Sequence, residues 1–230
     1  MKISRLLVLL VIMTTGYGIH AQDCRFYFPE ETGAVREMTS YDKKDKVTGK
    51  VRQTILEKKA TGSDLMLKVE NVIFDDKDAE VSRSEIELGC SNGVFKIDMS
   101  EYMSEMLQAY QTMEVELQGD NLQFPSSLSV GDALPEGNMN IKVRSNGIQV
   151  VNMDVNISNR KVEAQEKLST PAGTFDCYKI TFVTTAKTKL ITVQTQGVEW
   201  IAEKVGVVKS ESYAKNGKLN SYTLLTRLER

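Results

Sequence analysis

Histidine is almost missing from this sequence, whose 230 residues contain only His20. That residue lies in an N-terminal segment that we expect to be removed, which would leave the mature chain without an imidazole. Ser-His-Asp and Cys-His catalysis need an imidazole to take the proton of the nucleophile near neutral pH. The usual catalytic zinc sites need at least one histidine ligand. These enzyme classes are therefore excluded for the mature chain, and we expect no metal or other cofactor.

An excess of one charge and a glycine-rich phosphate loop are also missing. The chain has 29 basic and 31 acidic residues, a formal net charge of -2, so nothing indicates binding to a phosphate backbone. The composition, 41% hydrophobic and 26% charged, is that of an ordinary globular protein. We therefore expect no nucleic-acid partner.

Long apolar runs are limited to one short stretch near the N-terminus. Lys2 and Arg5 precede the apolar residues 6–13, and Ala21 ends a cleavage pattern, which predicts a signal peptide over 1–21. The apolar stretch is shorter than the roughly 18 residues that span a bilayer. Cys24 follows closely, but Asp23 directly before it breaks the lipoprotein pattern. We expect an exported chain without a transmembrane segment, in the periplasm, the outer envelope or at the cell surface.

Hydrophobic residues in the remaining chain alternate with polar ones, which is typical of half-buried antiparallel strands. Asn92-Gly93, Asn146-Gly147 and Asn216-Gly217 are hairpin turn signals between such runs. The pattern predicts strands at 33–41, 49–59, 63–75, 78–91, 93–98, 113–118, 138–145, 148–158, 160–169, 174–186, 188–200, 206–214 and 219–228.

These hairpins predict an all-β fold: an antiparallel meander that forms a strongly curved sheet or open barrel, with one short helix. Residues 22–230 would form a single β domain. A split into two half-barrels near 119–137, where glycine and proline cluster, stays open as an alternative.

In one segment the spacing of the hydrophobic residues changes from two residues to three or four. After Ser100, a plausible N-cap, the apolar residues Met103, Met106 and Tyr110 recur at helical spacing, which predicts a helix over 100–112. Such a stripe usually packs against a core, and it is also suited to adaptable contacts with a ligand. Together with Trp200, the only tryptophan, these three are our candidate ligand-binding residues.

Two groups of carboxylates were considered as sites. The acidic stretch 75–80 lacks the turn glycine and terminal Glu of an EF-hand, so we interpret it as a polar hairpin tip. Glu114 and Glu116 lie on one face of a predicted strand, as a carboxylate-based glycan hydrolase would require. A chance pair is expected among 31 acidic residues, and we predict no catalytic residue.

The three cysteines allow one disulfide and one free thiol in an oxidising compartment. Cys24 lies near the mature N-terminus, which frays unless it is tied down, and Cys90 ends a predicted strand. We predict a Cys24–Cys90 bridge and a free, inert Cys177, although strand geometry alone leaves open whether Cys177 is buried.

Four stretches carry a resemblance to a known family: 40–46 (SYDKKDK), 90–99 (CSNGVFKIDM), 170–180 (TPAGTFDCYKI), and 199–211 with its EWIA and VGVVKSE segments. Together they resemble the TapB-like family of exported β proteins of Gram-negative envelopes. Asp45 departs from the glycine more often found at that turn. The resemblance implies an envelope β protein and no established activity or catalytic residues.

We carry three functional hypotheses from the sequence. The first is a binding module without a catalytic centre, whose curved sheet holds an apolar or amphiphilic ligand, lipid-like or glycan. The second is a structural or interaction partner in an envelope protein complex. The third, with the least support, is the glycan hydrolase.

Overall fold

The computed structural model describes residue 24, residues 27–97 and residues 114–230. These residues form thirteen strands, which all belong to one antiparallel sheet. The strands are β1 (Val35–Asp42), β2 (Val47–Thr61), β3 (Asp64–Phe74), β4 (Glu80–Ser91), β5 (Val94–Ile97), β6 (Glu114–Gly119), β7 (Leu122–Pro125), β8 (Gly137–Ser145), β9 (Ile148–Thr170), β10 (Gly173–Lys187), β11 (Thr192–Ala202), β12 (Gly206–Ala214) and β13 (Leu219–Glu229).

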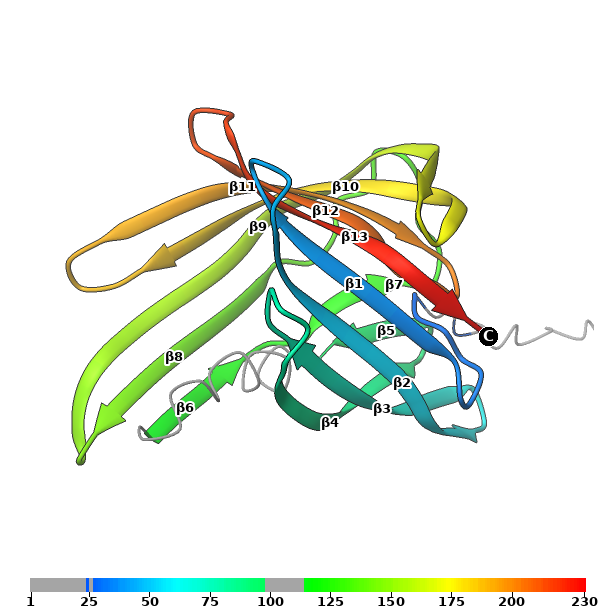
Figure 1. The fold of residues 1–230 in the computed structure, drawn as a ribbon, viewed down its shortest axis with the longest axis horizontal. Helices are drawn as coiled ribbons and strands as arrows, with labels where there is room; N and C mark the ends of the chain where they lie inside the picture. Colours follow the sequence, from blue (N-terminus) through cyan, green and yellow to red (C-terminus); the bar gives the residue numbers. More distant parts are fainter. Residues whose placement is uncertain (1–23, 25–26, 98–113) are drawn as a thin grey trace, which may run out of the picture.

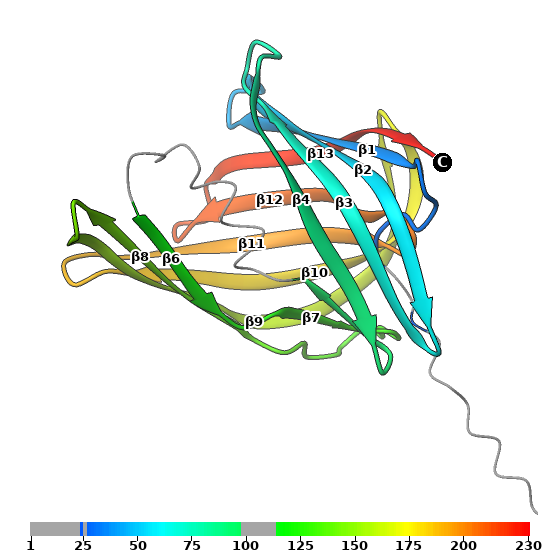
Figure 2. The same cartoon turned by 90° about the horizontal axis from the view of Figure 1, so that it is seen from below.

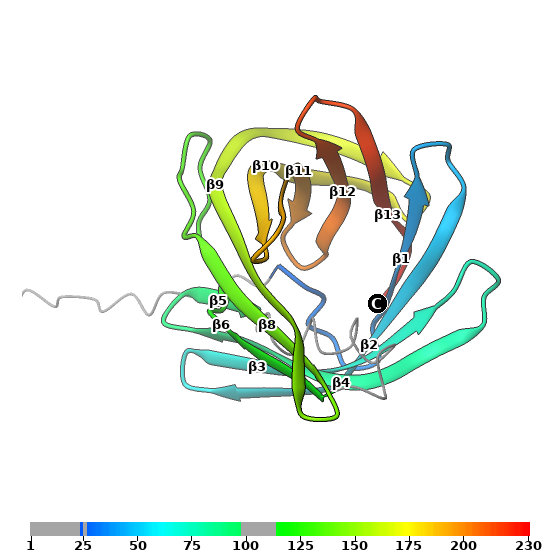
Figure 3. The same cartoon turned by 90° about the vertical axis from the view of Figure 1, so that its left-hand side faces the viewer.

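The order of the strands is β6-β8-β9-β10-β11-β12-β13-β1-β2-β3-β4-β5-β7. Most neighbouring strands in this order follow one another in the chain and form hairpins, so the predicted all-β meander is confirmed. The sheet curls strongly round an interior without joining its edges by a strand pair (Figures 1, 2 and 3). Its edge strands, β6 and β7, are neighbours in the chain, while β1 and β13 pair in the middle of the sheet.

Two strand predictions are corrected by the structure. The ranges 148–158 and 160–169 are one long strand, because Asn159 takes a φ of 53° within a bulged stretch and does not form a turn. β7 lies outside the strand ranges predicted from the sequence, in the stretch where glycine and proline cluster, and it ends in Phe124-Pro125. Proline is tolerated on an edge strand, where β7 lies.

The main core lies inside the curve of the sheet. Tyr27 and Phe28, from the segment before β1, are buried in it beside Phe95 of β5 and Phe124 of β7. The ring centroids of Tyr27, Phe95 and Phe124 are 6.1–6.4 Å apart, a range in which tilted aromatic rings attract. Strand β10 contributes Ile180. The face of β10–β12 that carries Ile180 is called the inner face below.

A second core lies on the opposite, outer face. In the unbroken strand β10, Cys177 and Ile180 are three residues apart, so their side chains lie on opposite sides of the sheet. Cys177 packs there with Trp200, Val208 and other buried residues. Leu168, Ala172 and Phe175, from the end of the β9–β10 hairpin, pack against this cluster.

Arg160 links β9 to the β7 edge. Its Nη1 donates to the backbone oxygens of Gln123 at 3.0 Å and Pro135 at 2.5 Å, and its guanidinium lies 4.7 Å from the ring centre of Phe124. Burial lowers the pKa of Arg160 to about 10, partly offset by the charge of Glu199. Burial also raises the pKa of Glu199, against the effect of Arg160. Hydrogen bonds thus span the gap that strand pairing leaves open.

The helix predicted over 100–112 lies outside the described residues. In the described part of the chain, no helix has the length and apolar character needed to cross a membrane.

Candidate functional site

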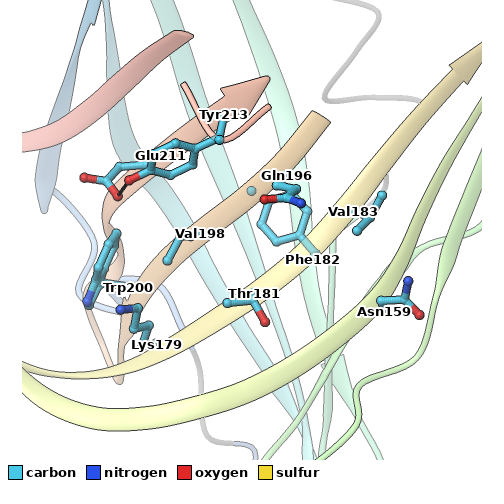
Figure 4. A pocket seen from close by; sticks show the side chains of 12 residues that line it. Asn159, Lys179, Thr181, Phe182, Val183, Gln196, Val198, Trp200, Glu211 and Tyr213 are labelled. Carbon is cyan, nitrogen blue, oxygen red and sulfur yellow. Dashed lines mark hydrogen bonds between the residues drawn. The ribbon is translucent and has the colours of Figure 1, made fainter. Parts of the chain in front are cut away.

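Three neighbouring strands present a pocket of about 460 Å³ on the outer face, shown in Figure 4. β10, β11 and β12 pair in regular register here, so residues directly opposite one another form rows across the sheet. The rows are Lys179–Trp200–Lys209, Thr181–Val198–Glu211 and Val183–Gln196–Tyr213. Alternation places all three rows on the face that carries Cys177. We call this site the Trp200 pocket.

Trp200 lies at one end of the pocket and is held from several sides. The Nζ atoms of Lys179 and Lys209 lie 5.2 and 4.9 Å from its ring centre, within the range of cation–π attraction. Its indole N–H donates a 2.6 Å hydrogen bond to Oε1 of Glu166 on β9. Only 6% of the residue is exposed. The indole therefore acts as a support that fixes the two ammonium groups.

The carboxylate in the pocket is ionised and paired. Lys209 Nζ lies 2.6 Å from Glu211 Oε1, and the Tyr213 hydroxyl donates to Glu211 Oε2. Burial alone would raise the pKa of Glu211, but these two hydrogen bonds outweigh it and the pKa is lowered. The bond to Glu211, with burial second, raises the pKa of Tyr213 to about 12. Such a carboxylate is a weak base and is suited to holding its neighbours in place.

The other end of the pocket depends on a glycine. Phe182 pairs across the strands with Gly197, and its ring lies over the glycine backbone. A Cβ at residue 197 would lie 2.2 Å from Phe182 Cζ, so any larger residue there would displace the ring. By alternation Phe182 shares the inner face with Ile180, so its ring packs under the sheet at this end, while Asn159 and Gln196 bring amide groups to the pocket.

Only one of the candidate ligand-binding residues from the sequence can be placed. Trp200 lines the pocket, whereas Met103, Met106 and Tyr110 lie outside the described residues. Sequence reasoning missed Lys179, Glu211 and their neighbours in the rows. The alternation of Lys209, Glu211 and Tyr213 was visible, but the register that sets them opposite Trp200 was not.

The carboxylate groups considered from the sequence lie elsewhere. Asp75 accepts the backbone N–H groups of Lys77 and Ala79 at the β3–β4 turn, which is the predicted polar hairpin tip. Glu116, on the edge strand β6, lies 3.4 Å from both Lys142 and Arg144. Among the described residues, no group of three or more His, Cys, Asp or Glu is arranged to hold a metal ion.

The cysteines are arranged as the sequence predicts. Cys24 and Cys90 form a disulfide, with Cα atoms 5.9 Å apart, and Cys177 is a buried free thiol. Burial, followed by the charges of Asp176 and Glu166, raises the pKa of Cys177 to about 11. The disulfide occupies the Cys24 sulfur, which is consistent with the broken lipoprotein pattern before it.

The fold and the disulfide define an all-β protein of a type suited to an extracytoplasmic location, where disulfides persist. Comparison with family models then shows that the chain belongs to the DUF3108-like family, whose model matches residues 31–225. No curated protein matches the chain.

Two solved structures share the fold. One, from Bacteroides fragilis, is named a "putative exported protein with YmcC-like fold" and is 23% identical, with a TM-score of 0.75. The other, from Parabacteroides distasonis, is named a "putative lipoprotein" and is 26% identical, with a TM-score of 0.76. Each match covers 90% of this chain and 100% of the other. The resemblance expected from the sequence thus holds at the level of exported β proteins, under a different family description.

Proposed function

We propose that this protein is a binding module of the cell envelope, without a catalytic centre, and that the Trp200 pocket holds a small amphiphilic ligand or part of a glycan. The observation that carries the proposal is the three cross-strand rows, in which eight of the nine residues line a pocket of about 460 Å³. Ligand sites in proteins typically measure about 300–1,000 Å³ and combine apolar walls with a few placed polar groups.

The lining favours a ligand with both hydroxyl groups and an apolar side. Gln196, Asn159 and Thr181 offer donors and acceptors, whereas Val183 and Val198 offer apolar contact. Trp200 and its lysine neighbours are fixed before any ligand arrives, so little side-chain entropy is lost on binding at that end. We also propose that the protein is exported and that it belongs to the narrower TapB-like family.

Trp200 is the only tryptophan, so its fluorescence reports directly on the pocket. Titration of the purified chain with fatty acids, phospholipids and envelope glycans should shift the emission for one class. A ligand at 100 times its dissociation constant should also add about 2.7 kcal/mol of stability. Gln196→Ala should weaken this binding, whereas Gln165→Ala, on an exposed part of β9, should not. Failure of every class to shift emission or stability would refute the proposal.

The second candidate function is that of an interaction partner in an envelope complex. Its support is the edge strand β6, which pairs only with β8 among the described strands and could accept a further strand. Pull-down from envelope extracts with the parent chain and with Val115→Pro on β6 tests it. Retention of the same protein by both would count against edge pairing. A hydrolase remains a third hypothesis, which turnover of a glycan, lost on a single carboxylate substitution, would establish.

A further inference from the structure

Five hairpin turns lie at one end of the sheet, because successive strands run in opposite directions. Three of them are polar, as turn chemistry favours: the β1–β2 turn at 43–46, the β3–β4 turn at 75–79 and the β12–β13 turn at 215–218. The β8–β9 turn, Asn146-Gly147, is also polar but is followed directly by Ile148, whereas the β10–β11 turn itself contains Leu190 and Ile191. The tips of both hairpins project from the body of the molecule in Figure 1. We call these two the apolar tips.

The apolar tips expose large aliphatic side chains. Leu190 is 90% exposed and Ile191 62% exposed in the β10–β11 turn, and Ile148 is 70% exposed beside the β8–β9 turn. A groove of about 820 Å³ is lined by Val150 and its neighbours at the start of β9 and by Leu190 and the residues before it, so these two segments form one surface. Large exposed aliphatic residues grouped in this way mark an interaction surface.

The turn that carries Leu190 is ordered by its own hydrogen bonds. The Thr188 hydroxyl accepts the backbone N–H groups of Leu190 at 3.3 Å and Ile191 at 3.1 Å. The N–H of Thr188 donates to the backbone oxygen of Ile191 at 2.8 Å. These donors are therefore satisfied without water, which lowers the cost of moving the tip into a low-dielectric environment.

Charged residues are placed beside the aliphatic ones. Lys187 and Lys189 flank Thr188 and are exposed, and Asp154 is the one acidic residue that lines the groove between the tips. Lysine stems can follow an apolar surface while the ammonium group reaches a polar layer. A surface with an apolar interior and anionic phosphates at its rim is complementary to this arrangement.

We propose that the apolar tips dock on an anionic lipid surface, with Leu190 and Ile191 entering the headgroup region and Lys187 and Lys189 contacting lipid phosphates. A bilayer is favoured over a protein partner by shape. Stable protein partners cover about 800 Å² on each side, which needs a broad face, whereas two narrow projecting hairpins are suited to insertion. This site is separate from the Trp200 pocket and does not rest on the function proposed for it.

Flotation with vesicles tests the proposal. The purified chain should float with vesicles of phosphatidylcholine mixed with phosphatidylglycerol, more weakly with phosphatidylcholine alone, and less at high salt. Leu190→Ser combined with Ile191→Ser should reduce binding at least tenfold with an unchanged melting temperature, because both side chains are exposed. The matched control is Val130→Ser, which removes another side chain that is 60% exposed.

A fluorescent label separates insertion from adsorption. Cys177 is buried, so Leu190→Cys offers one accessible thiol for an environment-sensitive dye in the absence of reductant. Its emission should shift to the blue on mixed vesicles, while that of Val130→Cys should not. The proposal is wrong if the parent binds neither vesicle, if the double serine variant binds equally well, or if both labels shift alike. A dimer that depends on Leu190, without vesicle binding, would also overturn it.

Discussion

The indole N–H of Trp200 on β11 donates a 2.6 Å hydrogen bond to Glu166, which lies on β9, two strands away. The bond crosses over β10 beside Cys177, which is paired directly with Glu166. It therefore ties the end of the β9–β10 hairpin to the strand that forms the centre of the Trp200 pocket.

Removing the acceptor should loosen Trp200. Glu166→Ala should lower the free energy of unfolding by about 1 kcal/mol, since one hydrogen bond of this kind is lost. It should also shift the tryptophan emission to the red as water gains access to the indole. Glu166→Gln is the matched control, because it keeps an oxygen acceptor at the same place. Equal spectra for the alanine variant and the parent would show that the bond does not hold the ring.

The Cys24–Cys90 disulfide should contribute strongly to stability. It closes a loop with a sequence separation of 66 residues, for which the chain-entropy model gives about 4 kcal/mol. Urea unfolding of Cys24→Ser should show a loss of that order, and reductant should then have no further effect. Peptide mapping without reduction should recover the Cys24–Cys90 pair, and a bridge that contains Cys177 would contradict the assignment.

Alkaline pH should destabilise the protein through Cys177. Its pKa is raised from 9.0 to about 11 in the folded state, so the folded protein holds this proton more tightly than the unfolded chain. The stabilisation is complete below pH 9 and is lost as the pH rises to about 11. Urea midpoints across this range should fall less steeply for Cys177→Ala than for the parent. Parallel slopes in the two proteins would exclude this thiol as the cause.

Arg160 should be essential to the bridge between β9 and β7. Arg160→Met leaves the oxygens of Gln123 and Pro135 without this donor and removes the charge that faces Glu199. Loss of one member of a buried charged arrangement costs about 3 kcal/mol or more in unfolding free energy. Arg144→Met, at a more exposed ion pair on β8, should change it by about 0.5 kcal/mol or less. Similar urea midpoints for the two variants would rule out a bridging role.

The sequence predicted the sheet well because alternation and turn chemistry are local signals. Asn92-Gly93 and Asn146-Gly147 do form hairpin turns, with both residues of each at positive φ. The predicted break between strands at Asn159 was wrong, because its positive φ belongs to a β-bulge that only the pairing with β10 reveals. Strand β7, which ends at Pro125, was not predicted, because its position at the edge of the sheet depends on topology and not on composition.

The candidate site was less predictable because it depends on register. Trp200 became a candidate because it is the only tryptophan. Its neighbours Lys179 and Lys209 lie on the adjacent strands β10 and β12, and no local sequence pattern predicts the register that sets them opposite Trp200. The disulfide was predictable because only three cysteines had to be arranged and one lay near a free end. The helix proposed over 100–112 stays a prediction.

The pairing of β1 with β13 has a consequence for the order of assembly. Val35 lies opposite Glu229, so the middle of the sheet joins residues from nearly opposite ends of the chain. During synthesis β1 emerges long before its partner, and only β2 can pair with it in the meantime. Contacts this distant along the chain pay a large closure entropy and slow folding. The β1–β13 pair in the middle of the sheet can therefore form only after the C-terminal strand has been synthesised.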